Sequence, residues 1–178
     1  MIVEPISARL TEAMLAYFHG EKIEALMFIL PIGLLSLVFG CWLLVEERAS
    51  FARGVSIPFL VMGIVMTAVG ATVGFRTPSQ LRRLQQEVVS APLQATQAEV
   101  ARMTKVNGKW TSYLILWGVM GVAGLALRFA TKGDLTQGLG IALVFFSGVG
   151  LLVDGFAERR THPYVSALRA IAQEPDMR

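Results

Sequence analysis

The side chains that could do chemistry are few and lie far apart in this chain. His19 and His162 are isolated, and Cys41 is the only cysteine, which excludes a disulfide within the chain and a thiolate metal cluster. Metal sites need clustered histidine, cysteine or carboxylate ligands, and this spacing does not provide them. The GxSxG, HExxH and phosphate-loop motifs do not occur. We therefore expect no catalytic residues, no metal and no cofactor.

One pair of carboxylates does have helical spacing. Asp154 and Glu158 are four residues apart, and Arg159 and Arg160 follow them directly. Opposite charges at such spacing stabilise a helix and its end. We interpret this group as a salt-bridged helix end beside a hydrophobic segment rather than as an acid–base pair.

The elements that hold these residues are predicted to be membrane helices. Of the 178 residues, 54% are hydrophobic and 16% are charged, whereas about 25% are charged in soluble domains. Four apolar stretches have the roughly 20 residues that cross the hydrocarbon layer: residues 25–45, 54–75, 110–128 and 135–153. None has an ionisable group near its middle, which counts against a pump or a coupled transporter. The predicted fold is an all-α polytopic membrane protein with two transmembrane hairpins and amphipathic interfacial helices.

The polar segment at residues 76–109 sets the predicted orientation. It carries six Lys and Arg against two Glu, and basic segments between spans stay in the cytoplasm. With both termini inside, 12 of the 16 Lys and Arg lie on the cytoplasmic side and four on the outer side. Membrane topology therefore explains the basic pI better than nucleic-acid binding does, and we expect no nucleic acid partner.

Three further segments have amphipathic patterns. Residues 1–20 predict a helix that lies on the membrane interface or packs on the cytoplasmic end of the bundle, and the pattern leaves both open. In residues 76–109, Thr77 and Pro78 predict a new helix start, and the apolar face is expected to contact lipid rather than a docked partner. The cytoplasmic tail, residues 154–178, has one apolar face and predicts a short surface helix.

Small residues line the predicted spans at three- and four-residue spacing. Gly70 and Gly74 form a GxxxG pair, which lets a neighbouring helix approach closely, and packing within the bundle is the favoured interpretation. The same faces could bind a partner in the membrane or a second copy of the chain. The hypothetical partner-binding residues are Gly33, Ser36, Gly70, Gly74, Gly121, Gly140 and Ser147.

The two halves of the chain share a pattern. Gly33 and some positions around it have the same or similar residue types as Gly121 and the positions around that residue, at one constant sequence offset. The second and fourth spans also end with similar residues. Each half reads as an amphipathic segment, a span outward, a short loop and a span inward. Duplication and chance similarity both remain open.

Several stretches carry a resemblance to a known class of protein. These are residues 17–35, with Tyr-Phe-His-Gly-Glu-Lys and Leu-Pro-Ile-Gly-Leu-Leu, the stretch Arg-Gly-Val-Ser-Ile-Pro at 53–58, and Glu99 with Arg102 and Met103. The chain resembles small four-span inner-membrane proteins of Gram-negative bacteria. Some of that class resemble immunity proteins against membrane-depolarising toxins delivered by type VI secretion. The resemblance implies a cognate toxin encoded beside this protein.

The leading functional hypothesis is therefore an inner-membrane immunity protein that binds and neutralises a pore-forming toxin without catalysis. Its expected partners are that toxin and membrane lipids. One alternative is a small channel or transporter subunit. Another is a membrane scaffold or regulator that docks a partner through residues 77–105.

Overall fold

The computed structural model describes residues 6–173, and every regular element among them is a helix. Residues 1–5 and 174–178 of the predicted first helix and tail lie outside the described residues. In chain order the elements are α1 (Ile6–Glu24), the π-helical turn η1 (Ala25–Ile29), α2 (Leu30–Glu46), α3 (Ser50–Ser90), α4 (Pro92–Asn107), α5 (Trp110–Ala130) and α6 (Asp134–Ala172).

Four helical stretches are each long and apolar enough to cross a membrane: Ala8–Glu46, Ser50–Ser90, Pro92–Ala130 and Asp134–Ala172. Their outer surfaces are rich in exposed large hydrophobic side chains, which water would not tolerate over such an area. The predicted all-α polytopic fold is confirmed, and the chain is a multi-pass membrane protein.

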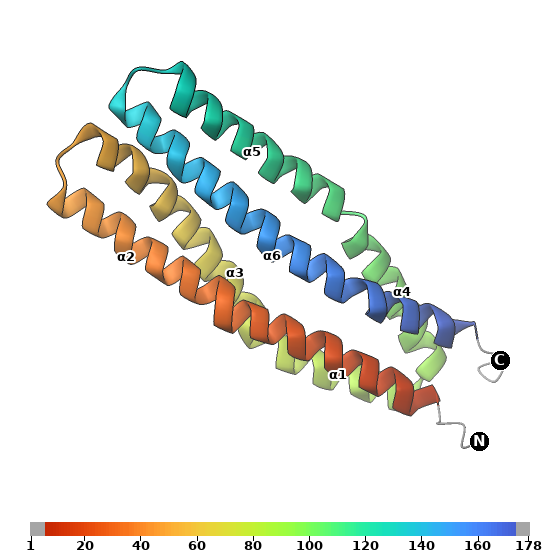
Figure 1. Ribbon diagram of the computed structural model, residues 1–178. Helices are drawn as coiled ribbons and strands as arrows, with labels where there is room; N and C mark the ends of the chain where they lie inside the picture. The colour runs from red at the N-terminus through yellow and green to blue at the C-terminus, as the bar shows by residue number, and fades with distance from the viewer. Residues whose placement is uncertain (1–5, 174–178) are drawn as a thin grey trace.

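The spanning helices form two hairpins, α2 with α3 and α5 with α6, as Figure 1 shows. The hairpins join where α3 packs on α6. The packing order is therefore α2, α3, α6, α5, and the outermost helices pack mainly on one neighbour each. The described spans form a row, so much of the surface of α2 and α5 is left for lipid or a partner.

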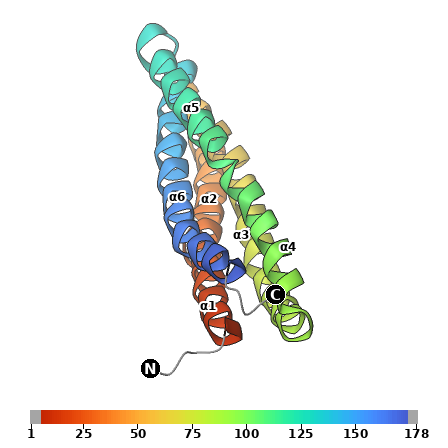
Figure 2. The same ribbon diagram turned by 90° about the vertical axis from the view of Figure 1, so that its right-hand side faces the viewer.

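Beyond the spans the helices close into a four-helix bundle. It consists of α1, residues 76–90 of α3, α4 and residues 154–172 of α6, and we call it the end bundle (Figure 2). Its core is Leu10, Met14, Tyr17, Phe18, Leu84, Val88, Ala95, Met103, Tyr164, Val165, Leu168 and Ile171. Both ends of the described chain lie at this end of the molecule (Figure 1).

The end bundle decides between the alternatives left open for the amphipathic segments. The apolar face of α1 is buried in the bundle core, so this helix packs on the bundle end. The faces of residues 76–109 and of the tail are buried in the same core. This corrects the expectation that the middle segment meets lipid, because its apolar side chains find partners within the chain.

The predicted helix start at Thr77 is also wrong, because α3 runs without a break past Pro78. Thr77 is almost fully buried, and its hydroxyl donates to the carbonyl of Val73 at 2.7 Å and lies 3.0 Å from the carboxylate of Glu21. This bond to the carbonyl four residues earlier is the usual one for a threonine hydroxyl inside a helix. The Thr77 side chain, which is typical of a helix start, therefore bonds within α3 and contacts α1.

The two halves repeat one packing contact. A Cβ added to Gly33 of α2 would lie 2.6 Å from the hydroxyl oxygen of Thr67 in α3, and one added to Gly121 of α5 would lie 2.6 Å from that of Ser147 in α6. Both contacts join the first helix of a hairpin to its second. Their equivalence supports the duplication hypothesis.

Candidate functional site

The predicted partner-binding residues of the first hairpin lie between its own helices. Cβ atoms built at Gly33 and Gly70 would collide with the backbone of the facing helix, and one at Gly74 would collide with the Leu26 side chain. Ser36 is also buried, with 4% of its surface exposed. These four residues bring α3 close to η1 and α2.

The remaining predicted residues hold the second hairpin together. Gly140 packs against the backbone of α5, and Gly121 packs against Ser147. The Ser147 hydroxyl donates to the Trp117 carbonyl at 2.7 Å. The predicted residues therefore lie inside the two hairpins: Gly33 and Gly70 between α2 and α3, Gly74 between α3 and η1, Ser36 buried on α2, and the other three between α5 and α6. The faces they form are already filled by neighbouring helices.

One surface that is open to the membrane is the outer side of α5. Among the residues of α5, only Gly124 is buried. Ile115 and Val122 are 61% and 68% exposed, and a Cβ at Gly118 would have no neighbour within 4 Å. These three residues follow helical spacing, so they share a face. Sequence reasoning missed this face because apolar residues surround a membrane helix on every side.

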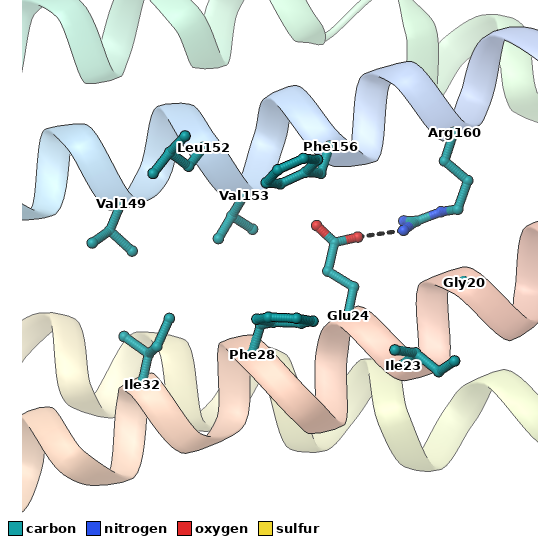
Figure 3. A pocket seen from close by; sticks show the side chains of 10 residues that line it. All are labelled: Gly20, Ile23, Glu24, Phe28, Ile32, Val149, Leu152, Val153, Phe156 and Arg160. Carbon is teal, nitrogen blue, oxygen red and sulfur yellow. Dashed lines mark hydrogen bonds and ion pairs between the residues drawn. The ribbon is translucent and has the colours of Figure 1, made fainter.

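A second open feature is a groove of about 440 Å³ (Figure 3). It lies between α6 on one side and the consecutive elements α1, η1 and α2 on the other. Its walls are apolar: Phe28, Ile32, Val149, Leu152, Val153 and Phe156. Glu24 and Arg160 lie at the end toward the end bundle. Ligand sites commonly have about 300–1,000 Å³ and mostly apolar walls with a few polar groups. The groove has both properties.

Glu24 and Arg160 form an ion pair that links α1 to α6. The guanidinium also lies over the ring of Tyr17, 5.6 Å from its centroid. The Arg160 chain passes Gly20, where a Cβ would lie 2.6 Å from the arginine Cδ. Burial raises the pKa of the Glu24 carboxyl, and the hydrogen bond from Arg160 opposes that rise. The predicted salt-bridged helix end at residues 154–160 is therefore wrong, because α6 continues without a break to Ala172 and Arg160 pairs with α1 rather than with its own helix.

The end bundle holds a second polar group that sequence reasoning did not single out as a site. The Glu99 carboxylate accepts hydrogen bonds from Arg102 Nε and Nη2, both at 2.7 Å, and from the Tyr164 hydroxyl at 2.9 Å. Tyr164 stacks on Tyr17 with 4.5 Å between ring centroids. Charged groups are buried only when paired in this way. In the sequence, this cluster is indicated only by Glu99 and Arg102 standing three residues apart. Such pairs are also common on exposed helix surfaces, so the spacing does not predict burial.

The Glu24–Arg160 pair and the Glu99 cluster hold helices of the end bundle together, and the groove has room for a ligand. Among the described residues, no group of three or more histidine, cysteine or acidic side chains could hold a metal ion. Cys41 is exposed on α2. His162 lies 3.9 Å from Glu158, four residues earlier on α6.

Comparison with protein-family models, with curated proteins and with solved structures finds no match.

Proposed function

We propose that this chain is a bacterial inner-membrane immunity protein that binds a pore-forming toxin within the bilayer and prevents its assembly. The observation that carries the proposal is the open face of α5. This helix stands at the edge of the row, and its surface is apolar and almost entirely unburied. A pore-former must place helices in the bilayer, and an edge helix of this kind can pair with one of them.

Helix pairing in a membrane depends on close packing, since lipid is as apolar as the side chains themselves. Gly118 lies between Ile115 and Val122 on the open face and has no neighbour of its own. A foreign helix could therefore approach the α5 backbone there. The seven small residues predicted as the contact then act indirectly, because they hold α5 and the other spans in place.

The proposed orientation puts the end bundle in the cytoplasm. The two ends of the described chain share one side of the molecule (Figure 1), and the positive charges predict which side it is. The loops at the opposite end, residues 47–49 and 131–133, are short. A toxin that arrives from the periplasm would thus meet the spans rather than a folded outer domain.

The test is protection of cells that produce a periplasmically targeted toxin from the gene beside this one. Membrane potential is read with a voltage-sensitive dye, with and without this protein. Val122→Trp on α5 and Val38→Trp on α2 form a matched pair, because both valines are 68% exposed. We expect Val122→Trp to lose protection at equal protein level and Val38→Trp to keep it.

Other outcomes separate the alternatives. Equal protection by both variants would contradict the α5 contact, and absence of any neighbouring toxin gene would contradict immunity. The scaffold alternative predicts instead that charge reversal at Arg82 and Arg83, on the outside of the end bundle, abolishes function. The channel alternative predicts ion flux in vesicles, and since the four spans form a row, it requires a second copy to enclose a lumen.

A further inference from the structure

The polar end of the groove contains an unpaired donor next to an unpaired acceptor. One oxygen of Glu24 bonds to Arg160 Nη1, while its Oε1 atom and the Arg160 Nε atom are buried without a partner. The two side chains are only 12% and 20% exposed. Buried polar atoms nearly always find partners, so this unmatched donor and acceptor at the end of a groove are suited to bind the polar group of a ligand.

The surrounding charge limits what that ligand can be. Of the groove's lining residues, Glu24 is negative and Arg160 is positive. Glu21 and Asp154 add negative charge close enough to act on Glu24. A purely anionic headgroup would therefore be repelled, whereas a group with both an ammonium and a phosphate would match the acceptor and the donor.

The rest of the groove is suited to a hydrocarbon chain. Figure 3 shows Phe28 and Ile32 facing Val149 and Val153 across the groove. These residues lie within or beside the predicted spans, while the ion pair lies at their boundary. An amphipathic molecule with its headgroup at the membrane surface would fit this gradient from polar to apolar.

We propose that the groove binds one phosphatidylethanolamine molecule. Its ammonium donates to the Glu24 carboxylate and a phosphate oxygen accepts from the Arg160 guanidinium, once these two lining side chains turn toward the groove, and one acyl chain lies along the apolar walls. The recognition depends on the N–H groups of the amine, so a phospholipid whose amine is fully methylated loses the bond to Glu24. This inference does not depend on the toxin proposal.

The direct test uses the delipidated full-length protein in detergent and needs no mutation. Phosphatidylethanolamine, its mono-, di- and trimethylated forms and phosphatidylglycerol, all with the same acyl chains, are titrated while thermal unfolding is followed. We expect apparent affinity to fall about tenfold from the unmethylated to the trimethylated lipid, as for loss of one hydrogen bond to a charged group. Equal affinity along the series, or tighter binding of phosphatidylglycerol, would overturn the proposal.

Two variants locate the site. Ile32→Trp fills the groove and should abolish stabilisation by added phosphatidylethanolamine, whereas Ile115→Trp, on the exposed face of α5, should retain it. Glu24→Gln should bind the methylated and unmethylated lipids equally. Full lipid stabilisation in Ile32→Trp, or an unchanged preference in Glu24→Gln, would place the lipid elsewhere. Should Glu24→Gln fail to fold, the methylation series on the natural protein still decides.

Discussion

Gly124 of α5 and Gly140 of α6 each lie against the other's backbone carbonyl oxygen. A Cβ built on Gly124 would be 2.7 Å from the Gly140 oxygen, and one built on Gly140 would be similarly close to the Gly124 oxygen. Backbone cannot move aside as a flexible side chain can, so this crossing tolerates glycine only. Since α5 packs mainly on α6, the pair sets how firmly the edge helix is held.

Gly140→Ala should therefore destabilise the protein, and Gly148→Ala on the same helix should not. The first adds a methyl group to a backbone contact, and overpacking of this kind typically costs about 1–3 kcal/mol. The second adds it where nothing lies within 4 Å. Thermal unfolding in detergent measures both. Equal unfolding temperatures for the two variants would show that the α5–α6 crossing is looser than described.

Reporter fusions test the proposed orientation. A fusion after residue 173 should report a cytoplasmic location, and one inserted just before Ser50, in the loop between α2 and α3, should report a periplasmic one. The expectation follows from the 12 basic residues on the end-bundle side against four on the other. The reverse pattern would be compatible with the fold, but it would place the end bundle in the periplasm. A toxin from the periplasm would then meet the end bundle before the spans.

The four spans could be predicted because lipid imposes a simple rule on sequence. A helix that crosses the hydrocarbon layer must be apolar over its full length, and no soluble fold needs such stretches. The segments outside the membrane follow no such rule. An amphipathic pattern such as Leu84 with Val88 is satisfied equally by lipid headgroups or by other helices, so sequence alone could not place it.

The continuity of α3 could not be predicted for a related reason. Thr77, Pro78 and Gln80 are typical of a helix start, and local sequence gives no sign that Thr77 faces Glu21 of α1. Tertiary contacts across the end bundle override that local preference. Glu99 was equally hard to interpret, because its burial depends on Tyr164, which lies 65 residues away.

Glu99→Gln should weaken the end bundle much more than Glu87→Gln. Glu99 is almost fully buried, and the change would leave the Arg102 guanidinium without its counter-charge. We expect a loss of about 3 kcal/mol, the lower end for broken buried pairs, because Arg102 stays 34% exposed. Glu87 pairs with Arg83 at the surface, and such helix pairs contribute about 0.3–0.5 kcal/mol.

Hydrogen exchange of α4 amides, together with chemical unfolding, measures the two changes. Faster exchange should appear in Glu99→Gln across α4, whereas Glu87→Gln should resemble the natural protein. Similar unfolding free energies for the two variants would mean that the Glu99 cluster contributes specificity rather than stability.

Tyr164 should make the end bundle sensitive to alkali. Burial raises the pKa of its phenol from 10.0, and the charge of Glu99 and its hydrogen bond with Glu99 raise it further. Burial also raises the pKa of Tyr17, which stacks on it. Well below pH 10 both phenols are protonated in the folded and the unfolded state, so their contribution to stability is fully present.

Above pH 10 the unfolded chain releases phenolic protons that the folded chain keeps, so the free energy of unfolding falls as pH rises. Each retained proton contributes a slope of about 1.4 kcal/mol per pH unit. Tyr164→Phe removes one such proton, so its unfolding free energy should start lower, through loss of the bond to Glu99, and decline less steeply between pH 10 and 12. Chemical unfolding at a series of pH values measures the slopes. A Tyr164→Phe curve parallel to that of the natural protein would show that the phenol ionises as readily when folded, and that water reaches the Glu99 cluster.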